Sequence, residues 1–149
     1  MRRFQIEHVG LAVADPKAAA EWYHRVLGFE ILHLVDGREG ANAFLRDGSG
    51  TVIELWRNPD TRAVAADLTH HLQVHVALRS ESPLEDARSL VEQGAELVEI
   101  AAVAPNGDQT ISVRDPWGNC IQLARRGAGS FFRRLPAEEG PRSHVSTGD

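Results

Sequence analysis

Four polar residues stand within otherwise apolar, strand-like stretches of this chain, and together they could bind a metal ion. They are His8, Glu54, His75 and Gln122, and the last two follow the first two at offsets of 67 and 68 positions. Alternation along a strand sends their apolar neighbours to one face and these four side chains to the other. Two imidazoles, a carboxylate and a carboxamide oxygen suit a divalent transition metal, being richer in nitrogen than magnesium or calcium sites.

Each residue taken alone has a simpler interpretation, because a single polar residue on an alternating strand usually faces solvent. A lone histidine in such a strand is also more often a hydrogen-bonded surface or core residue than a ligand. What favours metal ligation is the agreement of all four positions with an internal repeat. If two repeated units lie side by side, their polar faces line one trough in which the four side chains converge.

The repeat consists of a strand, a helix and a late strand, each recurring after 66 to 68 residues. Residues 7–13 are echoed by 73–78, and 52–55 by 120–123. A nearly constant offset across three elements predicts an internal duplication of one structural unit.

The elements expected in each unit follow from periodicity and turn residues. Asp15 is a good helix N-cap, Pro16 suits the first helical position, and Gly28 suits a left-handed stop. The second helix is expected over 83–93 with Gly94 after it. Strands are predicted over 6–13, 29–35, 43–46, 51–56, 72–78, 97–103, 110–113 and 119–124.

These elements predict an α+β fold of two tandem βαβββ units, with curled mixed sheets around a shared trough and helices on the outside. The units span about 4–57 and 70–126 of a single domain, 1–126. The connector between them has a possible helical turn at 63–68, and 127–149 form a tail rich in Gly, Ser, Pro and charge.

Composition narrows the classes of function. The chain has 149 residues, 42% of them hydrophobic and 25% charged, which is ordinary for a globular protein. A net charge of −5 without a basic cluster argues against a nucleic-acid or anionic-membrane partner. One cysteine, Cys120, excludes an intrachain disulfide, and no apolar run reaches membrane-spanning length. We therefore expect a cytoplasmic location.

Several motifs, in order, resemble the vicinal oxygen chelate superfamily, which includes glyoxalase I, methylmalonyl-CoA epimerase, extradiol dioxygenases, and fosfomycin and bleomycin resistance proteins. The resemblance covers about 4–126, and its ligand pattern is closest to glyoxalase I. The motifs are His8-Val9-Gly10-Leu11-Ala12-Val13, Trp22-Tyr23, Leu27-Gly28-Phe29, Val52-Ile53-Glu54-Leu55, His75-Val76-Ala77-Leu78 and Asp115-Pro116-x-Gly118-Asn119-x-Ile121.

The resemblance implies that His8, Glu54, His75 and Gln122 occupy the four metal-ligand positions. Gln122 departs from the pattern, because those relatives usually carry glutamate there, and an amide cannot take a proton. Ala12 stands where glyoxalase I usually has an arginine for the glutathione carboxylate, whereas the matching asparagine is present as Asn58. Relatives of this length usually form homodimers, often with sites drawing ligands from both chains.

The residues then indicate an enzyme that uses one divalent metal, whether nickel, zinc, cobalt, manganese or iron, on a small oxygen-chelating substrate. Glu54 is the only acid among the four, and we expect it to serve as ligand and general base in proton transfer, as in a lyase, isomerase or epimerase. Substrate contacts are expected from Phe44, Arg46, Trp56 and Asn58.

Two alternatives remain open. An extradiol-type dioxygenase would hold non-heme iron with His8, His75 and Glu54. A metal-free resistance or binding protein would instead sequester an aromatic drug by stacking it on Phe44, Trp56 and Trp117.

Overall fold

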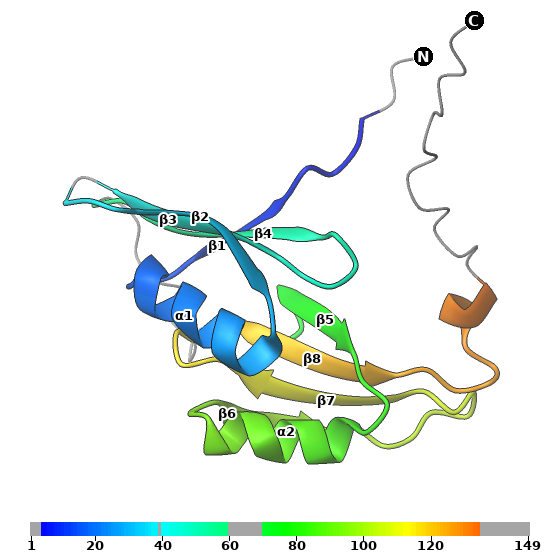
Figure 1. Cartoon of the computed structure of the whole chain (residues 1–149). Helices are drawn as coiled ribbons and strands as arrows, with labels where there is room; N and C mark the ends of the chain where they lie inside the picture. Colours follow the sequence, from blue (N-terminus) through cyan, green and yellow to red (C-terminus); the bar gives the residue numbers. More distant parts are fainter. Residues whose placement is uncertain (1–3, 39, 60–69, 135–149) are drawn as a thin grey trace, which may run out of the picture.

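The computed structural model describes residues 4–38, 40–59 and 70–134, and it confirms the α+β class with two tandem βαβββ units (Figure 1). The expected turn at 63–68 and the tail beyond 134 lie outside the described residues. The elements are β1 (Val9–Ala12), α1 (Pro16–Leu27), β2 (Glu30–Asp36), β3 (Ala41–Arg46), β4 (Val52–Arg57), β5 (His75–Arg79), α2 (Pro83–Glu92), β6 (Glu96–Ile100), β7 (Gln109–Arg114), β8 (Cys120–Arg125) and a 3₁₀ turn, η1 (Phe131–Arg134).

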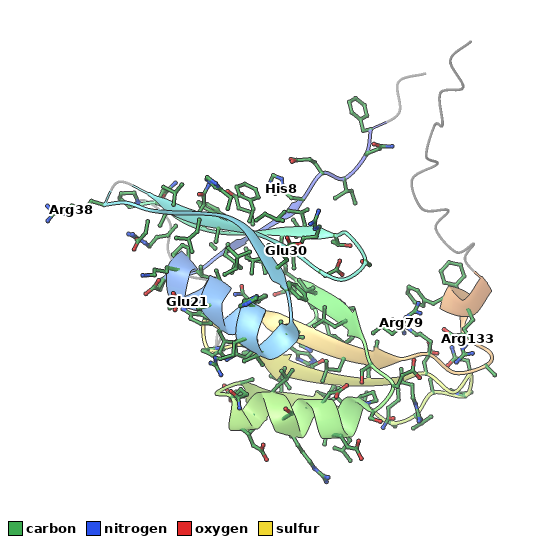
Figure 2. All side chains as sticks on the ribbon, in the orientation of Figure 1. His8, Glu21, Glu30, Arg38, Arg79 and Arg133 are labelled. Carbon is green, nitrogen blue, oxygen red and sulfur yellow. The ribbon has the colours of Figure 1, made fainter. Side chains whose placement is uncertain are left out.

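Each unit forms one four-stranded sheet, and the two sheets repeat the same topology. The first sheet has the order β1-β4-β3-β2 and the second β5-β8-β7-β6. In each, the first strand of the unit pairs in parallel with the last, and the other pairings are antiparallel. The β2–β3 hairpin projects from the body, with Arg38 at its far end (Figure 2). The duplication seen in the sequence is therefore a duplication of structure.

Two strands, β1 and β5, begin later than predicted. β1 begins at Val9 rather than at residue 6, and β5 at His75 rather than at 72. β1 pairs with β4 from Ile53 onward and β5 pairs with β8 from Cys120 onward, and among the described residues the segments before β1 and β5 pair with no strand. Those residues are exposed: Ile6 is 86% and Val74 74% accessible.

Helix α1 begins and ends as its sequence predicts. The Asp15 side chain accepts a hydrogen bond from the N–H of Ala18 at 3.0 Å, which satisfies one free donor of the first turn. Pro16 occupies the first turn. Gly28 ends the helix with a φ of 74°, a conformation that glycine adopts without the steric cost of a Cβ.

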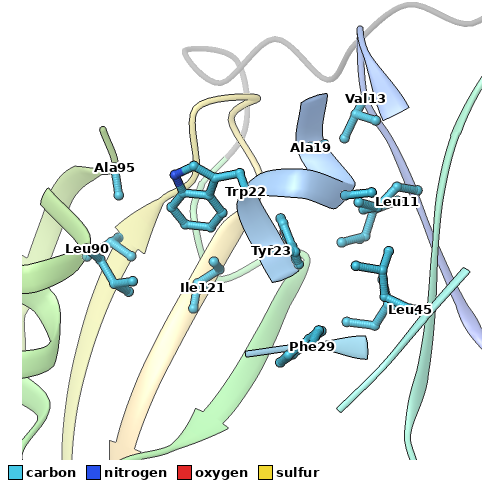
Figure 3. Close-up of a cluster of buried hydrophobic side chains, with 14 of the residues drawn as sticks. Leu11, Val13, Ala19, Trp22, Tyr23, Phe29, Leu45, Leu90, Ala95 and Ile121 are labelled. Carbon is cyan, nitrogen blue, oxygen red and sulfur yellow. The ribbon is translucent and has the colours of Figure 1, made fainter. Parts of the chain in front are cut away.

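The two helices occupy different positions. α2 covers the outer face of the second sheet, as expected, while α1 lies between the two sheets (Figure 1). Trp22 of α1 points toward Leu90 and Ala95 of the second unit, and Leu11 and Leu45 of the first sheet lie on the other side of the helix (Figure 3). One continuous apolar core thus spans both units.

Hydrogen bonds from α1 fix the seam between the units. The Trp22 indole N–H donates to the carbonyl of Gln93 at 2.7 Å, and the Tyr23 hydroxyl donates to the Asp115 carboxylate at 2.8 Å. Asp115 also accepts from the backbone N–H groups of Trp117 and Asn119, so it closes the turn between β7 and β8 and joins that turn to α1. Burial, and then the adjacent carboxylate, raise the pKa of Tyr23 well above its usual value.

Hydrogen bonds to the Asp108 carboxylate, which together we call the clasp, connect residues 126–130 to the β6–β7 turn. The carboxylate accepts hydrogen bonds from Gly127 N–H, Ser130 Oγ and Arg126 at 2.9, 3.1 and 3.2 Å. Desolvation opposes the effect, but these bonds lower the pKa of Asp108 below its usual value. A Cβ at Gly127 would lie 2.4 Å from the backbone of Gly107, so the approach requires glycine.

No helix in the described ranges is long and apolar enough to cross a membrane.

Candidate metal and substrate site

His8 and Glu54 meet on the face of the first sheet that α1 leaves uncovered. Ile53 and Leu55 of β4 are buried toward the core, so alternation turns Glu54 to the open face. His8 immediately precedes β1, whose Gly10 lies opposite Glu54 in the sheet register. The His8 Nε2 and Glu54 Oε2 atoms are 3.4 Å apart, and both side chains are partly buried. The structure thus brings together two of the four predicted ligands.

Neighbouring side chains orient this pair. His8 Nδ1 lies 2.7 Å from Glu7 Oε2, so the tautomer that is protonated at Nδ1 donates to Glu7 and leaves Nε2 without a proton beside Glu54. Asn42 of β3 donates from Nδ2 to the other Glu54 oxygen, Oε1, at 3.3 Å. The Phe44 ring stands edge-on to the His8 imidazole, with centroids 5.5 Å apart. A histidine held by a carboxylate through one nitrogen and free at the other is the usual arrangement of a metal ligand.

The separation of the pair fits joint coordination of one ion. Two ligand atoms that each lie about 2.1 Å from a metal at a tetrahedral angle are about 3.4 Å apart. The His8 and Glu54 atoms lie at that separation. Across residues 4–38, 40–59 and 70–134, however, no three His, Cys, Asp or Glu side chains are grouped so as to hold a metal. Within the described part of one chain, His8 and Glu54 therefore have no third side chain of these types beside them.

His75 lies in a different cavity, between β1 and the second sheet. This cavity has a volume of about 400 Å³, and neither His8 nor Glu54 lines it. His75 Nδ1 lies 3.2 Å from the carbonyl oxygen of Leu72, so here too a proton on Nδ1 leaves Nε2 available. Gln122 is half-buried on the neighbouring strand β8 and does not line this cavity.

Cys120 lines the second cavity as a buried side chain. Burial raises the pKa of its thiol, so the neutral form dominates near pH 7 and the sulfur packs as a small apolar group.

A first cavity, which we call the sheet cavity, lies beside Glu54 and has a volume of about 370 Å³. It is floored by the open faces of β2, β3 and β4. Gly10 borders this region: a Cβ there would lie 3.4 Å from the Trp56 indole nitrogen and 3.6 Å from Glu54 Oε2. The residues lining the cavity include His33, Val35, Asn42, Glu54, Trp56 and Arg57.

The residues predicted to contact substrate have different positions. Trp56 lines the sheet cavity, and Phe44 contacts His8. Arg46 forms an ion pair with Glu30 at 2.6 Å and lines neither cavity, and neither does Asn58.

Glu7, Asn42 and Arg57 were not predicted at the site. Asn42 could have been found by extending the alternation of Phe44 one step back along β3, which places both residues on the open face. Arg57 follows Trp56 at the end of β4, and alternation assigns its side chain to the face of Ile53 and Leu55, opposite to Glu54.

Three further histidines line the cavities, and Trp117 packs against the core. His33 is exposed and lines the sheet cavity. His70 and His71 line the second cavity with stacked rings, and His71 pairs with Glu99 at 2.9 Å. Trp117 packs against Trp22, with ring centroids 6.4 Å apart.

Comparison with known proteins agrees with this architecture. The chain is 29% identical to the lactoylglutathione lyase of Neisseria meningitidis over 128 residues, covering 82% of this chain and 91% of that protein. A glyoxalase family protein from Enterococcus faecalis has a similar structure, with a TM-score of 0.65, 25% identity, and coverage of 81% of this chain and 97% of its own.

A similar fold also occurs in a mutant of the fosfomycin resistance protein FosX from Listeria monocytogenes, crystallised with Mn(II) and a dihydroxypropylphosphonic acid. Its TM-score is 0.66 at 16% identity, with coverage of 90% of this chain and 97% of that one. A family model described as the Glyoxalase/Bleomycin resistance protein/Dioxygenase superfamily matches residues 5–123. The duplicated βαβββ fold and this match show that the chain belongs to the Glyoxalase/Bleomycin resistance protein/Dioxygenase superfamily.

Proposed function

We propose that this protein is a divalent-metal-dependent enzyme that transfers a proton next to a metal-chelated oxygen of a small substrate, as a glyoxalase-like lyase, isomerase or epimerase does. The observation that carries the proposal is the pair of His8 Nε2 and Glu54 Oε2 atoms, 3.4 Å apart beside the sheet cavity. Family membership supports it, because the lactoylglutathione lyase of Neisseria meningitidis is among the relatives.

We propose further that His75 and Gln122 reach the ion from a second copy of the chain. One chain supplies His8 and Glu54 on the first sheet, while its own His75 lines a separate cavity. A symmetric dimer that places the second sheet of one copy over the first sheet of the other would complete two equivalent four-ligand sites. Gln122 would then contribute a neutral amide oxygen.

In this site a divalent ion supplies Lewis-acid polarisation of the substrate oxygens. Glu54 is the base in our proposal: its carboxylate takes a proton from the carbon beside the polarised oxygen and returns it to the neighbouring atom, so the isomerisation needs no external acid. The Asn42 amide, bonded to Oε1, fixes the plane of the carboxylate, so Oε2 is the oxygen that would alternate between holding the ion and exchanging the proton. Gln122 cannot take this role, because an amide is not a base at neutral pH.

Metal content tests the proposal directly. The wild-type protein, Glu54→Ala and the control Glu21→Ala are each loaded with nickel, zinc, cobalt, manganese or iron(II), desalted and measured by elemental analysis. Glu21 is exposed on α1, away from the candidate site, so its variant removes a carboxylate without touching the predicted ligands (Figure 2). We expect near-stoichiometric metal in the wild type and the control and a large loss in Glu54→Ala.

Oxygen consumption, followed on the same preparations, separates the alternatives. Stoichiometric iron with oxygen uptake in the presence of catechols would favour the ring-cleaving dioxygenase. Metal without oxygen uptake agrees with proton transfer. Wild-type protein that retains no metal in any preparation would rule out the proposal and favour a metal-free binding protein.

A further inference from the structure

A short segment before β5 reaches across the second sheet to the strand at its other edge. His71 of this segment pairs with Glu99 of β6: the His71 Nε2 and Glu99 Oε2 atoms lie 2.9 Å apart, and the His71 side chain is only 13% exposed. β5 and β6 are the two edge strands of the sheet, so three strand spacings, or about 14 Å, separate them. Residues 70–74, which we call the crossing turn, therefore extend over the sheet.

The strand register shows which face of the second sheet the crossing turn covers. Glu99 lies opposite Ser112, and Ser112 lies opposite Gln122, so the three side chains share one face. A bulge between Leu97 and Glu99 interrupts the alternation of β6 and turns Glu99 to this face. It is the face turned away from the core, because Ile121, the neighbour of Gln122, is a core residue. Ser112 is nevertheless only 2% exposed, as expected where another segment lies over the sheet.

The second cavity lies between the crossing turn and this face. It is lined from the turn by His70, His71, Gln73 and Val74, and from the sheet by His75, Arg114 and Cys120. The turn has its own internal contacts. The Gln73 N–H donates to the His70 carbonyl at 2.9 Å, and the His70 and His71 rings are stacked with centroids 4.5 Å apart. Anchoring His71 therefore restrains the whole turn.

The crossing turn also holds the imidazole of His75, one of the predicted metal ligands. The carbonyl oxygen of Leu72 lies 3.2 Å from His75 Nδ1. A carbonyl oxygen can only accept a hydrogen bond, so this contact requires the tautomer that is protonated at Nδ1. In that tautomer the neutral ring keeps its lone pair on Nε2, the atom that could bind an ion. Restraining Leu72 thus restrains both the orientation and the tautomer of His75.

These contacts form a continuous path from β6 to the predicted ligand. The Glu99 carboxylate accepts from His71 Nε2, the crossing turn joins His71 to Leu72, and the Leu72 carbonyl accepts from His75. We infer that Glu99 is a positioning residue, which acts through the crossing turn to hold His75 with its Nε2 available to the ion. The inference rests on the proposed function, because that proposal makes His75 a ligand.

The tautomer of His75 tests this path in the metal-free protein. Long-range proton–nitrogen NMR spectra at alkaline pH, where imidazoles are neutral, distinguish a proton on Nδ1 from one on Nε2, and His75→Ala assigns the signals. We expect His75 to be protonated at Nδ1 in the wild type and to be a mixture of both tautomers in Glu99→Ala. The control Glu21→Ala removes an exposed carboxylate of α1 and should match the wild type (Figure 2).

A conservative variant separates the hydrogen bond from the charge. Glu99→Gln keeps an oxygen that can accept from His71, so it should retain more of the Nδ1-protonated form than Glu99→Ala does. A wild type in which His75 is protonated mainly at Nε2 would overturn the inference. So would a wild-type tautomer in Glu99→Ala, or equal losses of the Nδ1-protonated form in the two Glu99 variants.

Zinc affinity, measured by competition with a chelator, gives the consequence for the proposed site. Removing an outer partner of a metal ligand weakens binding by about 10- to 100-fold. We expect about 10-fold for Glu99→Ala and for His71→Ala, because Leu72 and His75 are kept. The double variant should lose no more than either single variant, since both changes release the same anchor.

Two results with zinc would contradict positioning through the turn. These are additive losses in the double variant, and a loss of affinity in Glu99→Ala without a change in the His75 tautomer. If the wild type binds no zinc while the tautomers behave as expected, Glu99 still positions His75, and the metal mechanism of the proposed function fails.

Discussion

The hydrogen bond between Tyr23 and Asp115 joins the two units across their seam, and Tyr23→Phe removes it while keeping the aromatic ring. Both residues are buried, with 2% and 4% exposure, and the oxygen atoms are 2.8 Å apart. The ring also stands edge-on to Trp22 and Phe29, contacts that phenylalanine would preserve. The substitution therefore isolates one hydroxyl.

The expected loss of stability depends on the hydrogen bonds that the Asp115 carboxylate retains. A hydrogen bond to a charged group is worth about 1.5–3 kcal/mol. The carboxylate retains the N–H groups of Trp117 and Asn119 and the Asn119 amide, so it is not left unsatisfied. We therefore expect a loss of about 2 kcal/mol in the free energy of unfolding, or a melting temperature about 4–8 °C lower for a chain of this size.

Urea unfolding followed by tryptophan fluorescence measures this loss, and its pH dependence provides a second test. The raised pKa of Tyr23 means that its contribution is fully present below the unfolded value of about 10 and is lost as pH rises toward the folded value. At about pH 11 the unfolded chain gains about 1.4 kcal/mol from ionising this group, and the gap between wild type and Tyr23→Phe should narrow by that amount. Tyr23 is the only tyrosine, so tyrosinate absorbance reports it alone.

A free energy of unfolding for Tyr23→Phe within about 0.5 kcal/mol of the wild type, the range of a neutral surface change, would contradict this prediction. Formation of tyrosinate near pH 10 in the folded protein, where an exposed tyrosine ionises, would contradict it as well.

Three further predictions concern the clasp and the shared site. Gly127→Ala should destabilise the fold by about 1–3 kcal/mol in urea unfolding, since its Cβ would meet backbone at 2.4 Å, whereas Gly48→Ala, with nothing within 4 Å, should not. Because the pKa of Asp108 is lower in the folded than in the unfolded chain, its carboxylate stabilises the fold above the unfolded pKa of about 3.9, and this stabilisation is lost as pH falls through the folded pKa. The free energy of unfolding of Asp108→Asn should therefore fall less steeply than that of the wild type as the solution is acidified. If each site draws ligands from both copies, refolding His8→Ala and His75→Ala together should restore about a quarter of the metal content of the wild type, because half of the random dimers are mixed and each mixed dimer has one intact site of two. A metal content no higher than that of the separate variants would contradict shared sites.

Much of the fold could be predicted because it depends on local signals. The offset of 66 to 68 residues predicted two equivalent sheets, and Asp15, Pro16 and Gly28 predicted the limits of α1. Alternation extended β1 back over residues 6–8, and it was wrong there because a strand also needs a partner. That partner, β4, pairs with β1 only from Val9.

The site was harder to predict, because it depends on how the two units are placed. Alternation put His8 and Glu54 on one face of the first sheet, and the structure brings them within 3.4 Å. Alternation could not tell how the second sheet is set relative to the first, since Trp22 and Tyr23 fix that placement through hydrogen bonds that an apolar helical pattern does not reveal. The position of His75 relative to Glu54 follows from that placement.

Gly10 has a consequence for how this scaffold could change its ligand. Because the backbone at this point of β1 carries no Cβ, the Trp56 indole and the Glu54 carboxylate occupy the room that a side chain would take. A methyl group there would touch the Trp56 indole and the Glu54 carboxylate at ordinary van der Waals distance, and a larger group would have to displace them. Substitutions at Gly10 of β1 can thus change the width of the sheet cavity, while its polar lining residues lie on other strands. The size of the ligand and its polar contacts could therefore change independently during evolution.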